Sequence, residues 1–304
     1  MKVLVTGATG FIGSNLIEAL YCNEELTVIA VSRHQVPHSG VETLVINEPW
    51  EEYSWVQTLK GVDVVVHLAG ISVESRESDQ TFEDVNIKLT RAVFTAAQDA
   101  GVKRFIYLSS VKACTEYTSA GQVLSEADPC QPKSPYGSSK YKAELVLEAT
   151  RSSAIDLIIV RPPLVYGAGV QGNFSALARL ASLRMPLPIG SLRSPRSMIY
   201  IGNLVNFIEA CISFKSSINE VFYVSDGHDL SIAELVAMMR ASNSRRACLI
   251  SVPPALISII ARVLGREEDV ARLTYPLQIS SERAKKVLGW TPPFNTAEAI
   301  RSSI

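Results

Sequence analysis

The chain has 304 residues, 47% of them hydrophobic, and a formal net charge of −1, so it can bury the core of one large domain or of two fused ones. It carries no long run of lysine and arginine, which argues against a nucleic-acid partner. Its five cysteines lie far apart, without CxxC spacing or a Cys/His cluster, which predicts free thiols in a reducing cytoplasm and no metal site.

The first half of the chain alternates short apolar runs with longer amphipathic segments. Strands that alternate with helices are typical of an α/β fold with a doubly wound parallel sheet, the Rossmann arrangement. The apolar runs predict buried parallel strands at Lys2–Thr6, Leu26–Val31, Thr43–Ile46, Asp63–Leu68, Arg104–Ser109 and Asp156–Val160. Helical spacing predicts helices over Phe11–Tyr21, Phe82–Ala100 and Tyr136–Ser152.

The second half changes character after Arg161, where prolines and glycines cluster. Strand-like segments return at Arg196–Ile201 and Glu220–Val224. We expect residues 1–164 to form a nucleotide-binding Rossmann domain, joined by a helix and a strand returning from about 203–224. Residues 165–202 and 225–304 are expected to form a smaller C-terminal substrate-binding lobe.

Targeting and membrane signals are not expected in this sequence. The N-terminal segment lacks the basic region and apolar core of a signal peptide. No segment reaches the ~18 uninterrupted apolar residues of a membrane span. The nearest, Val252–Leu264, contains two prolines and an arginine and predicts a buried or amphipathic helix.

A glycine-rich loop follows the first predicted strand. Val3–Gly13 reads VLVTGATGFIG, a strand, three glycines and the start of a helix. Glycine lets the backbone turn tightly and approach a pyrophosphate at the helix N-terminus, where N–H groups and the helix dipole favour an anion. This context predicts a dinucleotide site rather than a merely structural turn. Its candidate cofactor-binding residues are Gly7, Gly10, Phe11, Ile12 and Gly13.

The end of the second predicted strand indicates which dinucleotide binds. An NAD site usually carries an acidic residue about 20 positions beyond the glycines, where it accepts hydrogen bonds from the ribose hydroxyls. Ser32 and Arg33 occupy this place, so no carboxylate repels a 2′-phosphate and a guanidinium is present to bind one. The sequence therefore favours NADP(H). NAD(H) stays open, as does a solvated surface role for Arg33.

A tyrosine and a lysine share one predicted helix face. In Tyr136–Lys140, YGSSK, positions i and i+4 direct the phenol and the ammonium to the same side, although an exposed helix face is the alternative. Leu108–Ser110 ends the preceding strand, where parallel-sheet proteins bind their ligands. A nearby ammonium and an oxidised nicotinamide both favour the phenolate and lower the phenol's pKa. Ser110, Tyr136 and Lys140 are therefore the candidate catalytic residues.

Five motifs follow one another in a recognisable order: TGATGFIG (6–13), HLAG (67–70), LSS (108–110), YGSSK (136–140) and RPPLVYG (161–167). Together they resemble the extended short-chain dehydrogenase/reductases, and the resemblance runs from Lys2 to Pro293. That family includes UDP-galactose 4-epimerase, sugar-nucleotide 4,6-dehydratases and 4-keto-sugar reductases. The resemblance implies a UDP-sugar substrate and a nicotinamide cofactor.

The resemblance also implies individual roles. Tyr136 acts as acid/base on the sugar 4-oxygen, Lys140 holds the nicotinamide ribose and tunes Tyr136, and Ser110 hydrogen-bonds the same sugar oxygen. The cofactor cleft is lined by Leu68, Ala69, Gly70, Asn86 and Pro162. In the smaller lobe, Asn173 and Arg196 are candidates for binding the nucleotide diphosphate, with Arg266 and Arg272 weaker ones.

Some positions depart from the family pattern. The 4,6-dehydratases place an Asp-Glu pair directly after the catalytic Ser/Thr, where this chain has Val111 and Lys112. Valine cannot transfer a proton and lysine has the opposite charge, so dehydration is not expected, and Lys112 is a candidate substrate-binding residue. Asn203 stands where relatives often carry an acidic residue, and the sequence offers no function for it.

Reductase and epimerase remain to be distinguished. An epimerase keeps its cofactor and returns the hydride to the other face of the sugar, whereas a reductase consumes fresh cofactor. Because Ser32 and Arg33 suit NADPH, we expect reduction of a UDP-4-keto sugar in bacterial polysaccharide biosynthesis. The alternative is a UDP-glucose or UDP-N-acetylglucosamine 4-epimerase with bound NAD. A non-catalytic NADP-sensing regulator is less favoured, because such proteins tend to lose the Tyr/Lys pair.

The resemblance implies a homodimer that pairs through the helices Phe82–Ala100 and Tyr136–Ser152. Their apolar residues supply either that interface or the subunit core. These residues are Val93, Ala96, Ala97, Ala143, Val146 and Leu147.

Overall fold

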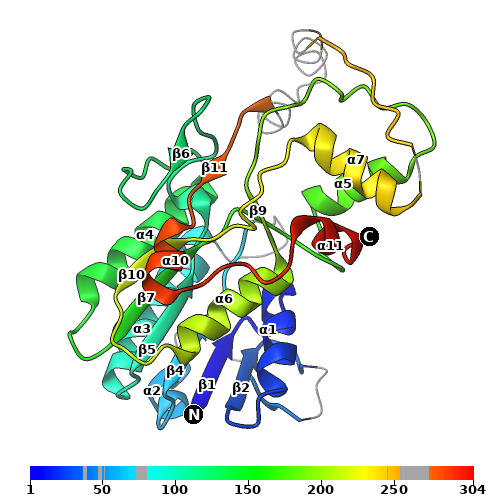
Figure 1. Ribbon diagram of the computed structural model, residues 1–304. Helices are drawn as coiled ribbons and strands as arrows, with labels where there is room; N and C mark the ends of the chain where they lie inside the picture. The colour runs from blue at the N-terminus through cyan, green and yellow to red at the C-terminus, as the bar shows by residue number, and fades with distance from the viewer. Residues whose placement is uncertain are drawn as a thin grey trace.

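A parallel β-sheet forms the centre of the computed structural model, which describes the chain except residues 37–39, 47–49, 51, 73–80, 245, 254–255 and 257–273. The seven strands run in the order β10-β7-β5-β4-β1-β2-β3 (Figure 1). The chain starts in the middle and builds toward each edge in turn, so the predicted doubly wound Rossmann fold is confirmed. The strands are β1 (Lys2–Thr6), β2 (Thr27–Ser32), β3 (Glu42–Val45), β4 (Val64–His67), β5 (Arg104–Leu108), β7 (Asp156–Arg161) and β10 (Glu220–Tyr223).

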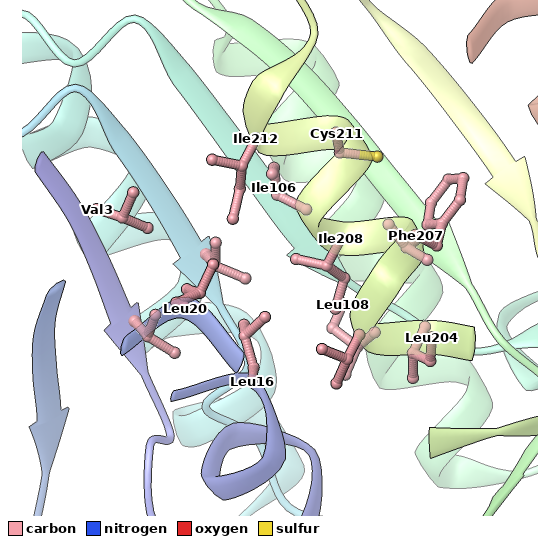
Figure 2. Packing of buried hydrophobic residues seen from close by; sticks show 14 of the residues in the cluster. Val3, Leu16, Leu20, Ile106, Leu108, Leu204, Phe207, Ile208, Cys211 and Ile212 are labelled. Atoms are coloured by element: carbon pink, nitrogen blue, oxygen red, sulfur yellow. The ribbon is translucent and has the colours of Figure 1, made fainter. Parts of the chain in front are cut away.

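Two helices cover one face of this sheet, α1 (Phe11–Tyr21) and α6 (Ile201–Ser213). Successive strand residues point to opposite faces, so Val3 of β1 joins this core while its neighbour Leu4 joins the other. Figure 2 shows Leu16 and Leu20 of α1 and Ile208 of α6 gathered over the sheet. The helix and strand expected to return from the second half are α6, which packs against α1, and β10, which pairs with β7.

The opposite face is covered by α2 (Trp55–Leu59), α3 (Thr90–Asp99) and α4 (Pro135–Thr150). Helix α3 is preceded by a π-helix, η1 (Glu83–Leu89), so the predicted helix Phe82–Ala100 is two segments. The apolar residues weighed as a dimer face or as core belong mostly to the core. Five of them lie on the buried sides of α3 and α4: Val93, Ala96, Ala97, Ala143 and Leu147.

A smaller lobe follows, with a core of its own around Tyr166, Phe174 and Leu235. The expected strand Arg196–Ile201 is shorter than predicted, and it pairs outside the main sheet. The lobe and its connections comprise β8 (Leu164–Tyr166), β9 (Met198–Tyr200), α5 (Asn173–Ser182), α7 (Ile232–Ser242) and α11 (Thr296–Arg301), with β6 (Val123–Leu124), β11 (Gln278–Ile279) and α10 (Glu282–Leu288) beside the sheet. Val252–Leu264 lies largely outside the described residues.

Asn203, which the sequence left without a function, joins the two parts of the molecule. Its buried amide donates to Asp226 Oδ1 at 2.7 Å and to the Phe294 carbonyl at 2.9 Å, and its oxygen accepts from Phe294 N at 2.9 Å. An aspartate here has no N–H to donate and would face the Asp226 carboxylate. The asparagine therefore fits a structural role in holding the C-terminal segment against α6.

Two cysteines contradict the prediction of free thiols. Cys114 and Cys130 form a disulfide, whereas Cys22, Cys211 and Cys248 are free. Gln131 N donates to the Cys114 carbonyl at 2.8 Å, which brings the two cysteines together across 16 positions of sequence. The prediction was wrong for this pair because wide spacing in sequence does not exclude proximity in the fold.

None of the helices that the structure describes is both long and apolar enough to cross a bilayer.

Candidate functional site

The glycine loop after β1 is shaped so that its backbone is exposed to a ligand. Gly7 has φ +69°, and a Cβ there would lie 2.7 Å from the backbone N of Ala69. A Cβ on Gly13 would lie 2.9 Å from the Cα of Ala8. Gly10 is the N-cap of α1, and no side chain caps this helix. The loop thus leaves a helix N-terminus without side chains in the way, which fits a pyrophosphate.

The residues that open α1 complete this loop. Phe11 and Ile12 are half-buried and pack against the core between α1, α6 and the sheet. Their side chains therefore anchor the first turn of α1, while its backbone faces the loop.

The end of β2 carries Ser32 and Arg33. Ser32 is buried, and its hydroxyl donates to the His34 carbonyl and accepts from His34 N at 3.2 Å. Arg33 is exposed beside it. Among the described residues of this turn, 33–36, none is acidic. Arg33 thus stands at the end of β2, the place where a ribose 2′-substituent binds in Rossmann proteins.

Asn86 ties the end of β4 to the helix that carries the candidate catalytic pair. It lies fully buried in η1 and makes two hydrogen bonds with the Ile71 backbone, both 2.9 Å. It also donates to Ser139 Oγ of α4 at 2.9 Å. π-helical turns are frequent at functional sites. Because its amide is engaged by the protein, Asn86 supports the cleft rather than reaching out of it.

Leu68, Ala69 and Gly70, which are predicted to line the cofactor cleft, directly follow β4. Ala69 N donates to Thr6 Oγ1 at 3.3 Å. A Cβ on Gly70 would lie 3.3 Å from Lys140 Nζ and 3.1 Å from Asn86 Oδ1. The predicted cleft lining and the predicted lysine are therefore neighbours.

His67, the last residue of β4, lies between two hydroxyls. Its ring nitrogens lie 2.9 Å from Thr6 Oγ1 and 3.0 Å from Thr90 Oγ1. Burial, with a smaller effect from the Lys140 charge, lowers the pKa of His67 to about 3. The imidazole is therefore neutral and structural at physiological pH.

Lys140 and Tyr136 extend from α4 toward the end of β5. Lys140 is buried, and its Nζ donates to the Leu108 carbonyl at 2.8 Å. Burial lowers the pKa of Lys140 to about 8, and the Glu144 charge opposes this effect. Burial also raises the pKa of Tyr136 to about 12, while a hydrogen bond with Ser110 acts in the opposite direction. The structure thus brings the three candidate catalytic residues together.

Ser110 is held by its neighbours in sequence and by Pro162. It is the N-cap of a 3-10 helix, η2 (Val111–Ala113), and its hydroxyl accepts from Lys112 N at 3.2 Å. Pro162 is buried, and its carbonyl accepts from Val111 N at 2.9 Å. Pro162 therefore positions the segment that follows the candidate catalytic serine.

A buried ion pair beneath Lys140 was missed by the sequence argument. Glu144 accepts from Arg161 Nη2 at 2.6 Å and from Arg161 Nε at 3.1 Å, and it also accepts from the Ser109 hydroxyl. Both charged residues are buried. The available signal was an acidic residue four positions after Lys140, on the same helix face.

The predicted substrate-binding residues lie in different parts of the fold: Lys112 in η2, Asn173 at the start of α5 and Arg196 just before β9. Lys112 is partly exposed, and its Nζ lies 3.6 Å from Glu116 Oε2. Arg196 donates to the Tyr275 carbonyl at 2.5 Å, and burial lowers its pKa while the Glu116 charge raises it. Asn173 begins α5, with its side chain outside the described part, as are Arg266 and Arg272.

Comparison with known proteins gives consistent results. Residues 3–224 match the model of the NAD dependent epimerase/dehydratase family. A UDP-glucose 4-epimerase of Vibrio cholerae is 35% identical, with 99% of this chain and 94% of that protein covered. An N-acetyl-alpha-D-glucosaminyl-diphospho-ditrans,octacis-undecaprenol 4-epimerase of Escherichia coli O157:H7 is 29% identical, with coverages of 95% and 86%. The structure of MoeE5 with UDP-glucose and NAD superposes with a TM-score of 0.78 at 26% identity, covering 100% of this chain and 97% of that one.

Proposed function

The chain belongs to the NAD dependent epimerase/dehydratase family, and we propose that it reduces the C4 keto group of a UDP-hexose with NADPH. It is an NAD(P)-dependent enzyme of the extended short-chain dehydrogenase/reductase type, and its relatives support chemistry at C4 of a sugar nucleotide. The choice of reduction rests chiefly on the end of β2, where Ser32 and Arg33 occupy the place of the acidic residue of many NAD sites. We place the reaction in bacterial polysaccharide biosynthesis.

The residues of the site have complementary tasks in this reaction. A bound nicotinamide supplies the hydride. Tyr136 donates its proton to the sugar 4-oxygen as negative charge develops there, and Ser110 holds the same oxygen. Lys140, placed near Gly70 of the predicted cofactor cleft, binds the ribose and favours the phenolate left behind.

The protonation state of Tyr136 is compatible with reduction. Burial raises the pKa of its phenol to about 12, so the proton is present at neutral pH. A protonated phenol is ready to act as a general acid, which reduction needs. Oxidation, the first half of an epimerisation, needs the phenolate, which the Lys140 ammonium and an oxidised nicotinamide would favour.

A 4-epimerase with tightly bound NAD is the second candidate, favoured by the names of the relatives. The UDP-glucose 4-epimerase of Vibrio cholerae aligns over nearly the whole chain, and the MoeE5 structure contains NAD. The two functions differ in their cofactor balance. A reductase should oxidise one added NADPH per UDP-4-keto sugar, whereas an epimerase should carry NAD through purification and interconvert UDP-glucose and UDP-galactose. Absence of NADPH oxidation with any UDP-4-keto-6-deoxyhexose would reject the reductase.

Arg33→Ala should weaken NADPH binding roughly tenfold or more, because a hydrogen bond to a charged group contributes about 1.5–3 kcal/mol. The affinity for NADH, which has no 2′-phosphate, should not change. Fluorescence titration of both cofactors measures the effect. Arg301→Ala, which removes an exposed arginine from α11, is the matched control and should bind NADPH normally. Equal NADPH affinities of Arg33→Ala and wild type would remove the support for NADP(H).

We also propose that the chain is a homodimer that pairs through the outer faces of α3 and α4. Leu145 of α4 is 50% exposed and apolar, as an interface residue would be. Light scattering at micromolar concentration should give twice the 33.1 kDa chain mass, and Leu145→Arg should shift it to the monomer. Leu183→Arg, at a residue 44% exposed in the other lobe, is the control. A monomeric wild type would contradict the proposal.

A further inference from the structure

Glu116 lies between the two segments that carry the catalytic serine and tyrosine. Its side chain is buried, at 9% exposure, between η2 and α4. One oxygen, Oε1, accepts a hydrogen bond from Ser134 Oγ at 2.6 Å. The other, Oε2, lies 3.6 Å from Lys112 Nζ. One carboxylate thus contacts both segments.

The Ser134 contact acts on the helix that presents Tyr136. Ser134 is the N-cap of α4, and its hydroxyl oxygen accepts from Gly137 N at 3.2 Å. A hydroxyl has one proton, and Glu116 accepts it, so the oxygen lone pairs remain for the Gly137 N–H. A carboxylate near a helix N-terminus also interacts favourably with the helix dipole. Glu116 therefore fixes the first turn of α4.

The Lys112 contact acts on the segment that presents Ser110. Lys112 follows Ser110 in η2, and its backbone N donates to Ser110 Oγ at 3.2 Å. A side chain at Gly137 would overlap the Lys112 carbonyl, so η2 and the start of α4 touch directly. Restraining Lys112 restrains the position of Ser110 against α4.

We propose that Glu116 is a positioning residue that sets the distance between Ser110 and Tyr136. The inference rests on the proposed function, since it assigns a task within that same site. Burial raises the pKa of the Tyr136 phenol, Ser110 lies close enough to oppose this rise, and the proposed reaction needs both hydroxyls at the same sugar oxygen. The contacts described for Glu116, with Ser134 and Lys112, connect it to both residues indirectly. Burial lowers the pKa of Arg196 in the smaller lobe, while the charge of the same carboxylate raises it, so Glu116 lies near the place where the two lobes meet.

The test compares kcat, KM and cofactor affinity in three variants. Glu116→Ala should lower kcat about tenfold, because small displacements of catalytic groups are costly. The dissociation constant of NADPH should stay within roughly twofold, because the contacts described for Glu116 lie at η2, at the start of α4 and near Arg196 rather than at the glycine loop. KM for the UDP-sugar reports separately on Lys112 and Arg196, the candidate substrate-binding residues near this carboxylate. Glu116→Gln keeps an acceptor for Ser134 but loses the charge pairing with Lys112, so it should recover part of the lost kcat. Asp128→Asn removes a carboxylate from the same segment whose described hydrogen bonds are with Ser125, and it should behave as wild type.

The outcomes separate this inference from the proposed function. Glu116→Ala with wild-type kcat overturns the inference, and so does an equal loss in Glu116→Gln. If Glu116→Ala does not fold, Glu116→Asp decides. Its shorter side chain cannot reach Ser134 and Lys112 together, so kcat should fall while NADPH binding stays normal, and wild-type kcat rejects the proposal. If Tyr136→Phe is fully active, the proposed function fails instead, whatever the Glu116 variants do.

Discussion

Tyr136→Phe should lower kcat by ~10²–10⁴-fold, the range that general acid–base catalysis typically contributes. The substitution removes only the phenol hydroxyl, so the helix, the Lys140 contact with the Leu108 carbonyl and the cofactor cleft stay in place. NADPH affinity and thermal stability should therefore match those of wild type. The loss should fall on kcat rather than KM, because proton donation strengthens in the transition state.

A matched control for this variant lies on the same helix. Tyr141→Phe removes a hydroxyl from α4 at a half-buried position and should retain full activity. The pH profile gives a second readout of Tyr136. Because reduction needs the protonated phenol, the rate should be level across neutral pH and fall on the alkaline side, toward the raised pKa of about 12. Near-normal turnover of Tyr136→Phe would require another proton donor.

Glu144→Ala should lower the free energy of unfolding by about 3–5 kcal/mol, because it leaves a buried guanidinium without its partner. Arg161 is 7% exposed and donates two hydrogen bonds to Glu144, at 2.6 and 3.1 Å. Its remaining side-chain partner is the Tyr223 hydroxyl at 3.2 Å, which carries no compensating charge. Urea denaturation followed by circular dichroism measures the change.

The control uses a second ion pair on the same helix. Glu148 Oε2 lies 3.7 Å from Arg151 Nε, and the Glu148 side chain is 48% exposed. Exposed pairs contribute about 0–1 kcal/mol, so Glu148→Ala should have little effect. Similar losses of unfolding free energy in Glu144→Ala and Glu148→Ala would mean that burial does not determine how much the Glu144–Arg161 pair stabilises the fold.

The Rossmann part of the fold was predictable because its signals are local. Strand β1 and helix α1 lie where apolar runs and glycine spacing put them, and β10 returns to the sheet from the expected segment. The π-helix η1 was not predictable, since Asn86 reaches Ile71 and Ser139 through contacts distant in sequence. The disulfide between Cys114 and Cys130 likewise depends on how an irregular segment folds back.

The site residues that belong to family motifs could be predicted from the sequence. The residues outside those motifs that hold them in place could not. Ser110, Tyr136 and Lys140 lie together as the motif order implies. No sequence motif pointed to Glu144, Glu116 or Ser134. Their contacts join segments near β5, η2 and α4 that are separated in sequence. A sequence pattern identifies the reacting groups more readily than the residues that hold them.

Transfer of a label from the cofactor to the sugar tests the central claim most directly. The purified chain would be given a UDP-4-keto-6-deoxy-N-acetylhexosamine and NADPH that carries deuterium at the transferable position of its nicotinamide. We predict a product with one deuterium at C4 and one NADP⁺ formed for each product molecule. A product without deuterium, or a chain that interconverts 4-epimers of a UDP-hexose with no exchange of the label, would contradict reduction at C4 by added NADPH.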